Sequence, residues 1–72
     1  MIPLRLERLN PSKDSGRIFR WMVADGATVT RDQPVVEIEM GRATYEVEAP
    51  SAGVITIVAK QFATVAVGAV LA

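Results

Sequence analysis

An alternating run interrupted by a glycine is the feature that most constrains how this chain folds. In EIEMGRATYEV, residues 37–47, apolar and polar side chains alternate on both sides of Gly41-Arg42. A period of two is typical of a strand with one buried face, and a two-residue turn containing glycine joins two such strands into a hairpin. The sequence therefore predicts a tight β-hairpin that holds Arg42 in solvent at its tip.

The same alternation assigns the two faces of the hairpin, because successive side chains of a strand point to opposite faces. The apolar side chains expected to face the core are Val36, Ile38 and Met40 before the turn and Ala43, Tyr45, Val47 and Ala49 after it. The opposite face carries Thr44 and the glutamates Glu37, Glu39, Glu46 and Glu48. We expect these glutamates to share one exposed surface below the turn, where they either keep the sheet soluble or contact a partner.

The rest of the chain is also predicted to consist of strands and turns. Strand-like runs cover residues 2–9, 17–23, 35–40, 43–49, 54–60 and 65–72, and turn-forming residues separate them at 10–16, 24–34 and 50–53. Ile18 and Trp21 break strict alternation, which predicts a bulge in their strand. No run has helical periodicity, so we expect an all-β sandwich or small barrel.

Two short sequence patterns occur twice in the chain. Gly16-x-Ile18 recurs 37 residues later as Gly53-x-Ile55, and residues 27–29 (ATV) recur 36 residues later as residues 63–65. The repeat predicts quasi-two-fold symmetry, in which each half of the sequence builds a similar sheet.

Length and composition limit the function further. The chain has 72 residues, half of them hydrophobic, so we expect residues 1–72 to form a single domain with one small core. It contains neither histidine nor cysteine. The usual nucleophile–base pairs and metal ligands are therefore missing, and we expect no catalytic residue and no metal site.

The net charge and the hydropathy of the chain limit the partners and the cellular location that we expect. The formal net charge is zero, which argues against nucleic-acid binding, because that binding takes its affinity from many phosphate contacts. No signal peptide is visible, and the apolar run at residues 65–72 is shorter than the roughly 20 residues needed to cross a bilayer. We expect a soluble cytoplasmic protein without membrane contact, monomeric as an isolated domain, or a piece of a longer chain.

Several motifs, in order, resemble a lipoyl domain of the biotinyl/lipoyl attachment superfamily. The resemblance is carried by GRIFRWMVADGATV, QPVVEIEMGRATYEVEAPSAGVI and VAVGAVLA, from about Gly16 to Ala72, and residues 2–9 fit the first strand. It implies a flattened, hammerhead-type barrel of two four-stranded sheets related by a quasi-two-fold axis. It also implies a non-catalytic, swinging-arm carrier domain from the acyltransferase component of a 2-oxo acid dehydrogenase complex.

In this family a lysine at the hairpin tip is amide-linked to lipoate or biotin. The family's motif maps onto Glu39, Met40, Gly41, Arg42 and Ala43, so arginine stands where the lysine is expected. A guanidinium stays protonated and is not nucleophilic. We therefore expect no cofactor on Arg42 in this form, and lipoate, in preference to biotin, only if residue 42 were lysine. Lys13 and Lys60 are expected to lie away from the hairpin.

The resemblance also implies partners and leaves alternatives open. The implied partners are lipoate-protein ligase and the enzymes of a 2-oxo acid dehydrogenase complex, with Glu37, Glu46 and Glu48 as a recognition surface. One alternative is a lipoyl-like protein-interaction module in which Arg42 contacts an acidic partner. Another is a biotinyl carrier, because Met40 flanks the turn. The sequence does not decide which 2-oxo acid is served, or whether Arg42 is natural or a deliberate replacement of lysine.

Overall fold

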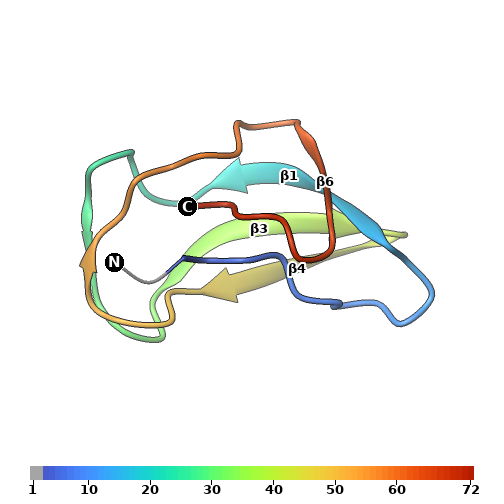
Figure 1. The fold of residues 1–72 in the computed structure, drawn as a ribbon, viewed down its shortest axis with the longest axis horizontal. Coiled ribbons are helices and arrows are strands. Elements are labelled where there is room, and N and C mark those ends of the chain that lie inside the picture. The colour runs from blue at the N-terminus through green and yellow to red at the C-terminus, as the bar shows by residue number, and fades with distance from the viewer. Residues whose placement is uncertain (1–2) are drawn as a thin grey trace.

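A computed structural model describes residues 3–72 as strands joined by turns (Figure 1). The strands are β1 (Ser15–Trp21), β2 (Thr28–Val29), β3 (Pro34–Met40), β4 (Ala43–Glu48), β5 (Gly53–Val54) and β6 (Thr64–Ala66). Strand β2 lies inside the segment 24–34 that was predicted to be turns, because two residues are too few to show an alternation. Ile2, predicted in the first strand, lies outside the described residues. No helix in residues 3–72 is long and apolar enough to cross a membrane.

The strands form two antiparallel sheets, as the all-β prediction requires. The first has the order β4-β3-β1-β6, and the second pairs β2 with β5. The expected four-stranded second sheet continues beyond this pair in a less regular form. Residues 4–6 run beside residues 69–72, where the Leu4 N–H donates to the Ala72 carbonyl (3.0 Å) and the Leu6 N–H donates to the Ala69 carbonyl (2.9 Å). The predicted first strand is thus an extended segment with a single ladder bridge, Arg5 to Val70.

The hydrogen-bond register confirms the quasi-two-fold symmetry. Strand β1 pairs with β6 through Gly16–Val65 and Arg17–Thr64, and β5 pairs with β2 through Gly53–Val29 and Val54–Thr28. The second set of pairs repeats the first: the β5 residues lie 37 positions after the β1 residues, and the β2 residues lie 36 positions before the β6 residues, the same shifts that were found in the sequence. Two amide bonds repeat in the same way, from the Phe62 N–H to the Ile18 carbonyl (2.7 Å) and from the Gly26 N–H to the Ile55 carbonyl (2.8 Å).

The core lies between the two layers and is apolar. Its fully buried side chains are Leu6, Ile18, Val35, Val36, Ile38, Met40 and Leu71. Trp21 is half-buried against this core, and its indole Nε1–H donates to the Ala59 carbonyl of the opposite layer (2.8 Å). The predicted bulge is present, since the β1–β3 register shifts between Ile18 and Arg20.

Candidate functional site

The β3–β4 hairpin ends in the turn Gly41-Arg42, at one end of the long axis of the molecule (Figure 1). Met40 pairs with Ala43 across the turn, and Glu39 pairs with Thr44. Gly41 has a φ of 67°, whereas Arg42 does not have a positive φ. A positive φ at the first central residue alone is the pattern of a type II′ turn, which favours glycine there. The Arg42 side chain is exposed.

Packing beneath the turn fixes the hairpin to the core. Met40 is only 1% exposed, although it directly precedes the turn. Gly16 of β1 lies beneath it, and a Cβ at Gly16 would stand 2.8 Å from Ile38 Cγ2 and 3.2 Å from Met40 Cε. The absence of a side chain at Gly16 therefore lets β3 approach β1 closely. Arg42 at the tip is therefore exposed, whereas Met40, which precedes the turn, is anchored in the core.

A loop far away in the sequence lies against the turn. A Cβ at Gly41 would stand 3.0 Å from Asn10 Nδ2 and 3.5 Å from Lys13 Cε. This corrects the expectation that Lys13 lies away from the hairpin. Sequence reasoning missed the contact because it joins two turns that no local pattern links.

Local hydrogen bonds hold this loop in shape. Asn10 Oδ1 accepts from the Ser12 N–H (3.0 Å) and hydroxyl (2.8 Å), and the Lys13 N–H donates to the Asn10 carbonyl (3.1 Å). Arg8 Nη1 donates to the Lys13 carbonyl (2.8 Å) and to the Asp14 carboxylate (2.7 Å). The backbone that carries Lys13 is thus fixed beside the turn, while its side chain is exposed.

The outer face of the hairpin sheet is less acidic than the sequence suggested. Glu37 and Glu46 are cross-strand neighbours, which places them on one face of the hairpin, as predicted. Two arginines of β1 lie beside this acidic face, because Arg20 pairs with Glu37 and Arg17 approaches Glu39 (3.9 Å). Glu48 lies at the other end of β4, opposite Pro34. Of the proposed recognition residues, only Glu46 and Glu48 lack an ion-pair partner within residues 3–72.

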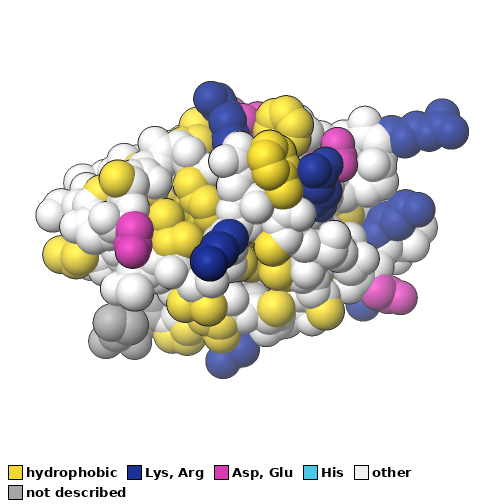
Figure 2. Space-filling view, turned by 90° about the horizontal axis from the view of Figure 1, so that it is seen from above, with side chains coloured by type: hydrophobic (Ala, Val, Ile, Leu, Met, Phe, Trp, Pro, Cys, Tyr) yellow, Lys and Arg dark blue, Asp and Glu magenta, His cyan; other side chains and the backbone are white. Residues whose placement is uncertain are grey.

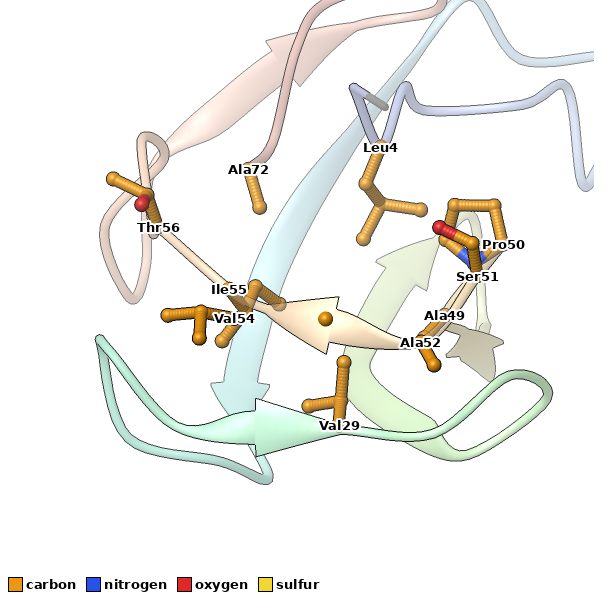
Figure 3. Close-up of a pocket in the computed structure, with 11 residues that line it drawn as sticks. Leu4, Val29, Ala49, Pro50, Ser51, Ala52, Val54, Ile55, Thr56 and Ala72 are labelled. Carbon is orange, nitrogen blue, oxygen red and sulfur yellow. The ribbon is translucent and has the colours of Figure 1, made fainter. Parts of the chain in front are cut away.

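The hollows of the surface lie away from the turn. A cavity of about 350 Å³ lies beside β5, and Leu4 and Val29 enter it from opposite sides (Figure 3). A groove of about 330 Å³ between residues 4–9 and β4 has Glu7, Glu46 and Glu48 on its walls. No group of acidic side chains in the described part of the chain has the geometry of a metal site. The exposed tip of the hairpin is therefore part of neither hollow.

Comparison with known proteins identifies relatives of this architecture. A family model described as "Biotin-requiring enzyme" (Biotin_lipoyl) matches residues 9–72. The solution structure of the lipoyl domain of the 2-oxoglutarate dehydrogenase complex from Azotobacter vinelandii is similar to the structure of this chain, with a TM-score of 0.79 and 32% sequence identity. That match covers 99% of this chain and 91% of the other.

Two curated relatives are acyltransferase components. The dihydrolipoyllysine-residue acetyltransferase component of the pyruvate dehydrogenase complex from Mycobacterium tuberculosis is 37% identical over 71 residues, which cover 97% of this chain and 13% of the relative. The corresponding succinyltransferase component of the 2-oxoglutarate dehydrogenase complex from Cupriavidus necator is 32% identical over 60 residues, covering 83% of this chain and 14% of the relative. The chain thus spans about one seventh or less of the length of these relatives.

Proposed function

Since this chain belongs to the biotin/lipoyl attachment family as a lipoyl domain, we propose that residues 1–72 act as a carrier-type domain of a 2-oxo acid dehydrogenase acyltransferase component. Such a domain catalyses nothing itself and presents its hairpin tip to other enzymes. The observation that supports this role is the exposed two-residue turn above an anchored Met40. The proposal includes a cytoplasmic monomer, with lipoate-protein ligase and the enzymes of the complex as partners.

Residue 42 does not fit covalent attachment of lipoate. An acceptor must lose a proton and attack an activated acyl carbon with a free lone pair. The lone pairs of a guanidinium are delocalised and the group stays protonated, so Arg42 offers charge without nucleophilicity. We propose that the turn keeps the acceptor position and that residue 42 stays unmodified.

A lipoyl type is favoured over a biotinyl type. The family model covers both, but the similar proteins are acyltransferase components of dehydrogenase complexes and a lipoyl domain from such a complex. Met40, which suggested a biotinyl hairpin, is a core residue here and not part of the exposed tip.

Intact mass measurement tests this function. The protein and its Arg42→Lys variant are incubated with lipoate-protein ligase, lipoate and ATP, and a parallel pair is incubated with biotin ligase and biotin. We expect one added lipoyl group on residue 42 of the variant, located by peptide mapping, and none on residue 42 of the original chain. Biotinylation of the variant without lipoylation would establish the biotinyl type. A variant that neither ligase modifies would contradict a carrier role.

A further inference from the structure

Strand β5 has one free edge within residues 3–72. It pairs with β2 alone, and the Ile55 N–H donates to the Ala27 carbonyl on that side (2.9 Å). The backbone groups of successive residues in a strand point to opposite edges. The N–H and the carbonyl of Val54 therefore point away from β2, toward the side of β5 on which Leu4 and Ala72 lie (Figure 3).

The equivalent edge of β1 is covered in the other half of the molecule. The Ile18 N–H donates to the Ala63 carbonyl (2.9 Å), which repeats the bond from Ile55 to Ala27 after the shifts of 37 and 36 residues. The other edge of β1 pairs with β3, where Arg17 is opposite Glu39. Arg17 is the counterpart of Val54, so symmetry assigns a neighbouring strand to the free edge of β5.

Another repeated hydrogen bond shows where such a strand would lie. The Met22 N–H donates to the Val35 carbonyl (2.8 Å), and the Ala59 N–H donates to the Leu71 carbonyl in the same way (3.0 Å). A strand that continued this register along β5 would take the place that residues 36–40 take beside β1.

The cavity of about 350 Å³ beside β5 lies at this place, since residues 53–56 and Ala72 line it. None of its lining residues is charged. On the face shown in Figure 2, charged side chains lie mainly in the half that holds the turn, and the β5 end is mostly uncharged. Ile55 is 8% exposed, whereas its counterpart Ile18, which β3 covers, is fully buried. The cavity therefore suits apolar side chains.

We propose that the free edge of β5 and this cavity bind an extended segment of a partner protein, which joins β5 as an antiparallel strand. Main-chain hydrogen bonds to a sheet edge give such a segment affinity, and pockets for alternate side chains give it specificity. In the counterpart β3, Ile38 and Met40 are fully buried, while Glu37 and Glu39 alternate with them. We therefore expect the partner segment to carry apolar side chains at every second position. The site lies at the end of the molecule away from the turn, so it does not depend on the proposed carrier function (Figure 1).

Titration of the ¹⁵N-labelled protein with a capped VEIEMG peptide, which copies residues 36–41, tests the proposal by NMR. We expect saturating peptide to slow hydrogen exchange of the Val54 amide about tenfold or more, because that N–H becomes hydrogen-bonded. The capped peptide VEEIMG is the matched control, since it has the same composition without the alternation. It should bind about tenfold more weakly, because it cannot turn both apolar side chains to the same face.

Two substitutions at one position separate the main chain from the side chain. Val54→Pro removes the N–H that faces the bound segment and should weaken binding about tenfold, the effect of one lost hydrogen bond. An edge strand tolerates proline where the N–H faces solvent. Val54→Ala keeps the N–H and should bind within about twofold of the original, because the side chain is mostly exposed. Circular dichroism verifies the fold of both variants, and the peptide pair decides the question if Val54→Pro does not fold.

Equal binding of the two peptides would overturn the proposal, because it would indicate unspecific apolar attraction. Unchanged exchange of the Val54 amide would also overturn it, since the peptide would then lie elsewhere. If sedimentation showed a dimer without peptide that Val54→Pro dissociates, the occupant of the edge would be a second copy of this chain. Lipoylation of the Arg42→Lys variant is measured at the other end of the molecule, so failure of the β5 site and failure of the carrier function give different results.

Discussion

Phe62 has a left-handed backbone conformation, and the equivalent position in the other half of the molecule is a glycine. Its φ is 68°, and its quasi-symmetric counterpart, Gly26, has a φ of 86°. A side chain with a Cβ in this left-handed region costs roughly 1–2 kcal/mol. Phe62 is 56% exposed, and its ring centroid lies 4.8 Å from the Arg17 guanidinium carbon. Burial in the core therefore compensates little of this backbone cost.

At position 62 we expect glycine to be more stable than alanine. Both variants lose the ring, but only Phe62→Gly relieves the left-handed backbone, so its free energy of unfolding should exceed that of Phe62→Ala by about 1 kcal/mol. Urea denaturation measures the difference. At Thr64, an exposed position in β6, the order should reverse, because glycine weakens an extended strand. The same order at both positions would mean that Phe62 is not strained.

On the scale of elements, the hairpin combines a rigid base with a free tip, and the two should respond differently to mutation. Met40→Ala removes a side chain that is 1% exposed and should lower the free energy of unfolding by about 2–5 kcal/mol. Arg42→Ala removes an exposed side chain and should change it by less than about 0.5 kcal/mol. Chemical denaturation of both variants measures this contrast. A large loss for Arg42→Ala would show that the tip supports the fold.

The hairpin itself was predictable from the sequence, whereas its surroundings were not. Alternation on both sides of Gly41 fixed the strands and the turn, since one residue of slippage would expose every apolar side chain. Strict alternation, in contrast, places Arg17 and Arg20 on opposite faces of β1. The bulge between Ile18 and Arg20 resets the phase, and Arg20 then reaches Glu37 while Arg17 approaches Glu39. A bulge was expected, but its consequence for these ion pairs depends on which strand lies next to β1.

The contact between Lys13 and the turn was unpredictable for a related reason. It depends on how a loop folds back over a hairpin, and sequence periodicity describes only what happens within each segment. The Asn10 turn that fixes Lys13 has a recognisable composition, because Asn and Pro are frequent in turns. Composition gives no direction in space, so the expectation of a distant Lys13 was wrong.

On the scale of the whole molecule, the quasi-two-fold symmetry makes a second chain order feasible. Residues 4–6 run antiparallel beside residues 69–72, as β4 runs beside β3, so Leu4 and Ala72 lie next to each other like the strands of a second hairpin. A circular permutant that joins the ends by a short glycine-rich linker and opens between Gly41 and Arg42 should fold to the same sheets. We expect its free energy of unfolding to lie within about 2 kcal/mol of the original.

The position of the new opening provides the control. A permutant opened between Ile38 and Glu39 interrupts the central strand β3, and circular dichroism and urea denaturation should show that it does not fold cooperatively. If the permutant opened at the turn also failed, the continuity of the hairpin would be essential for folding, and the symmetry would not extend to stability.

The β3–β4 turn is separated from the paired segments 4–6 and 69–72 along the long axis of the molecule. The long axis measures 32 Å, against 19 and 17 Å across, and the turn lies at the end of this axis away from the paired residues Leu4 and Ala72 (Figure 1). A surface, a fluorescent protein or another domain attached next to that pair would hold the molecule at a place distant from the turn. A rotation of the molecule about that pair would then displace Arg42 by more than it displaces the residues next to the pair.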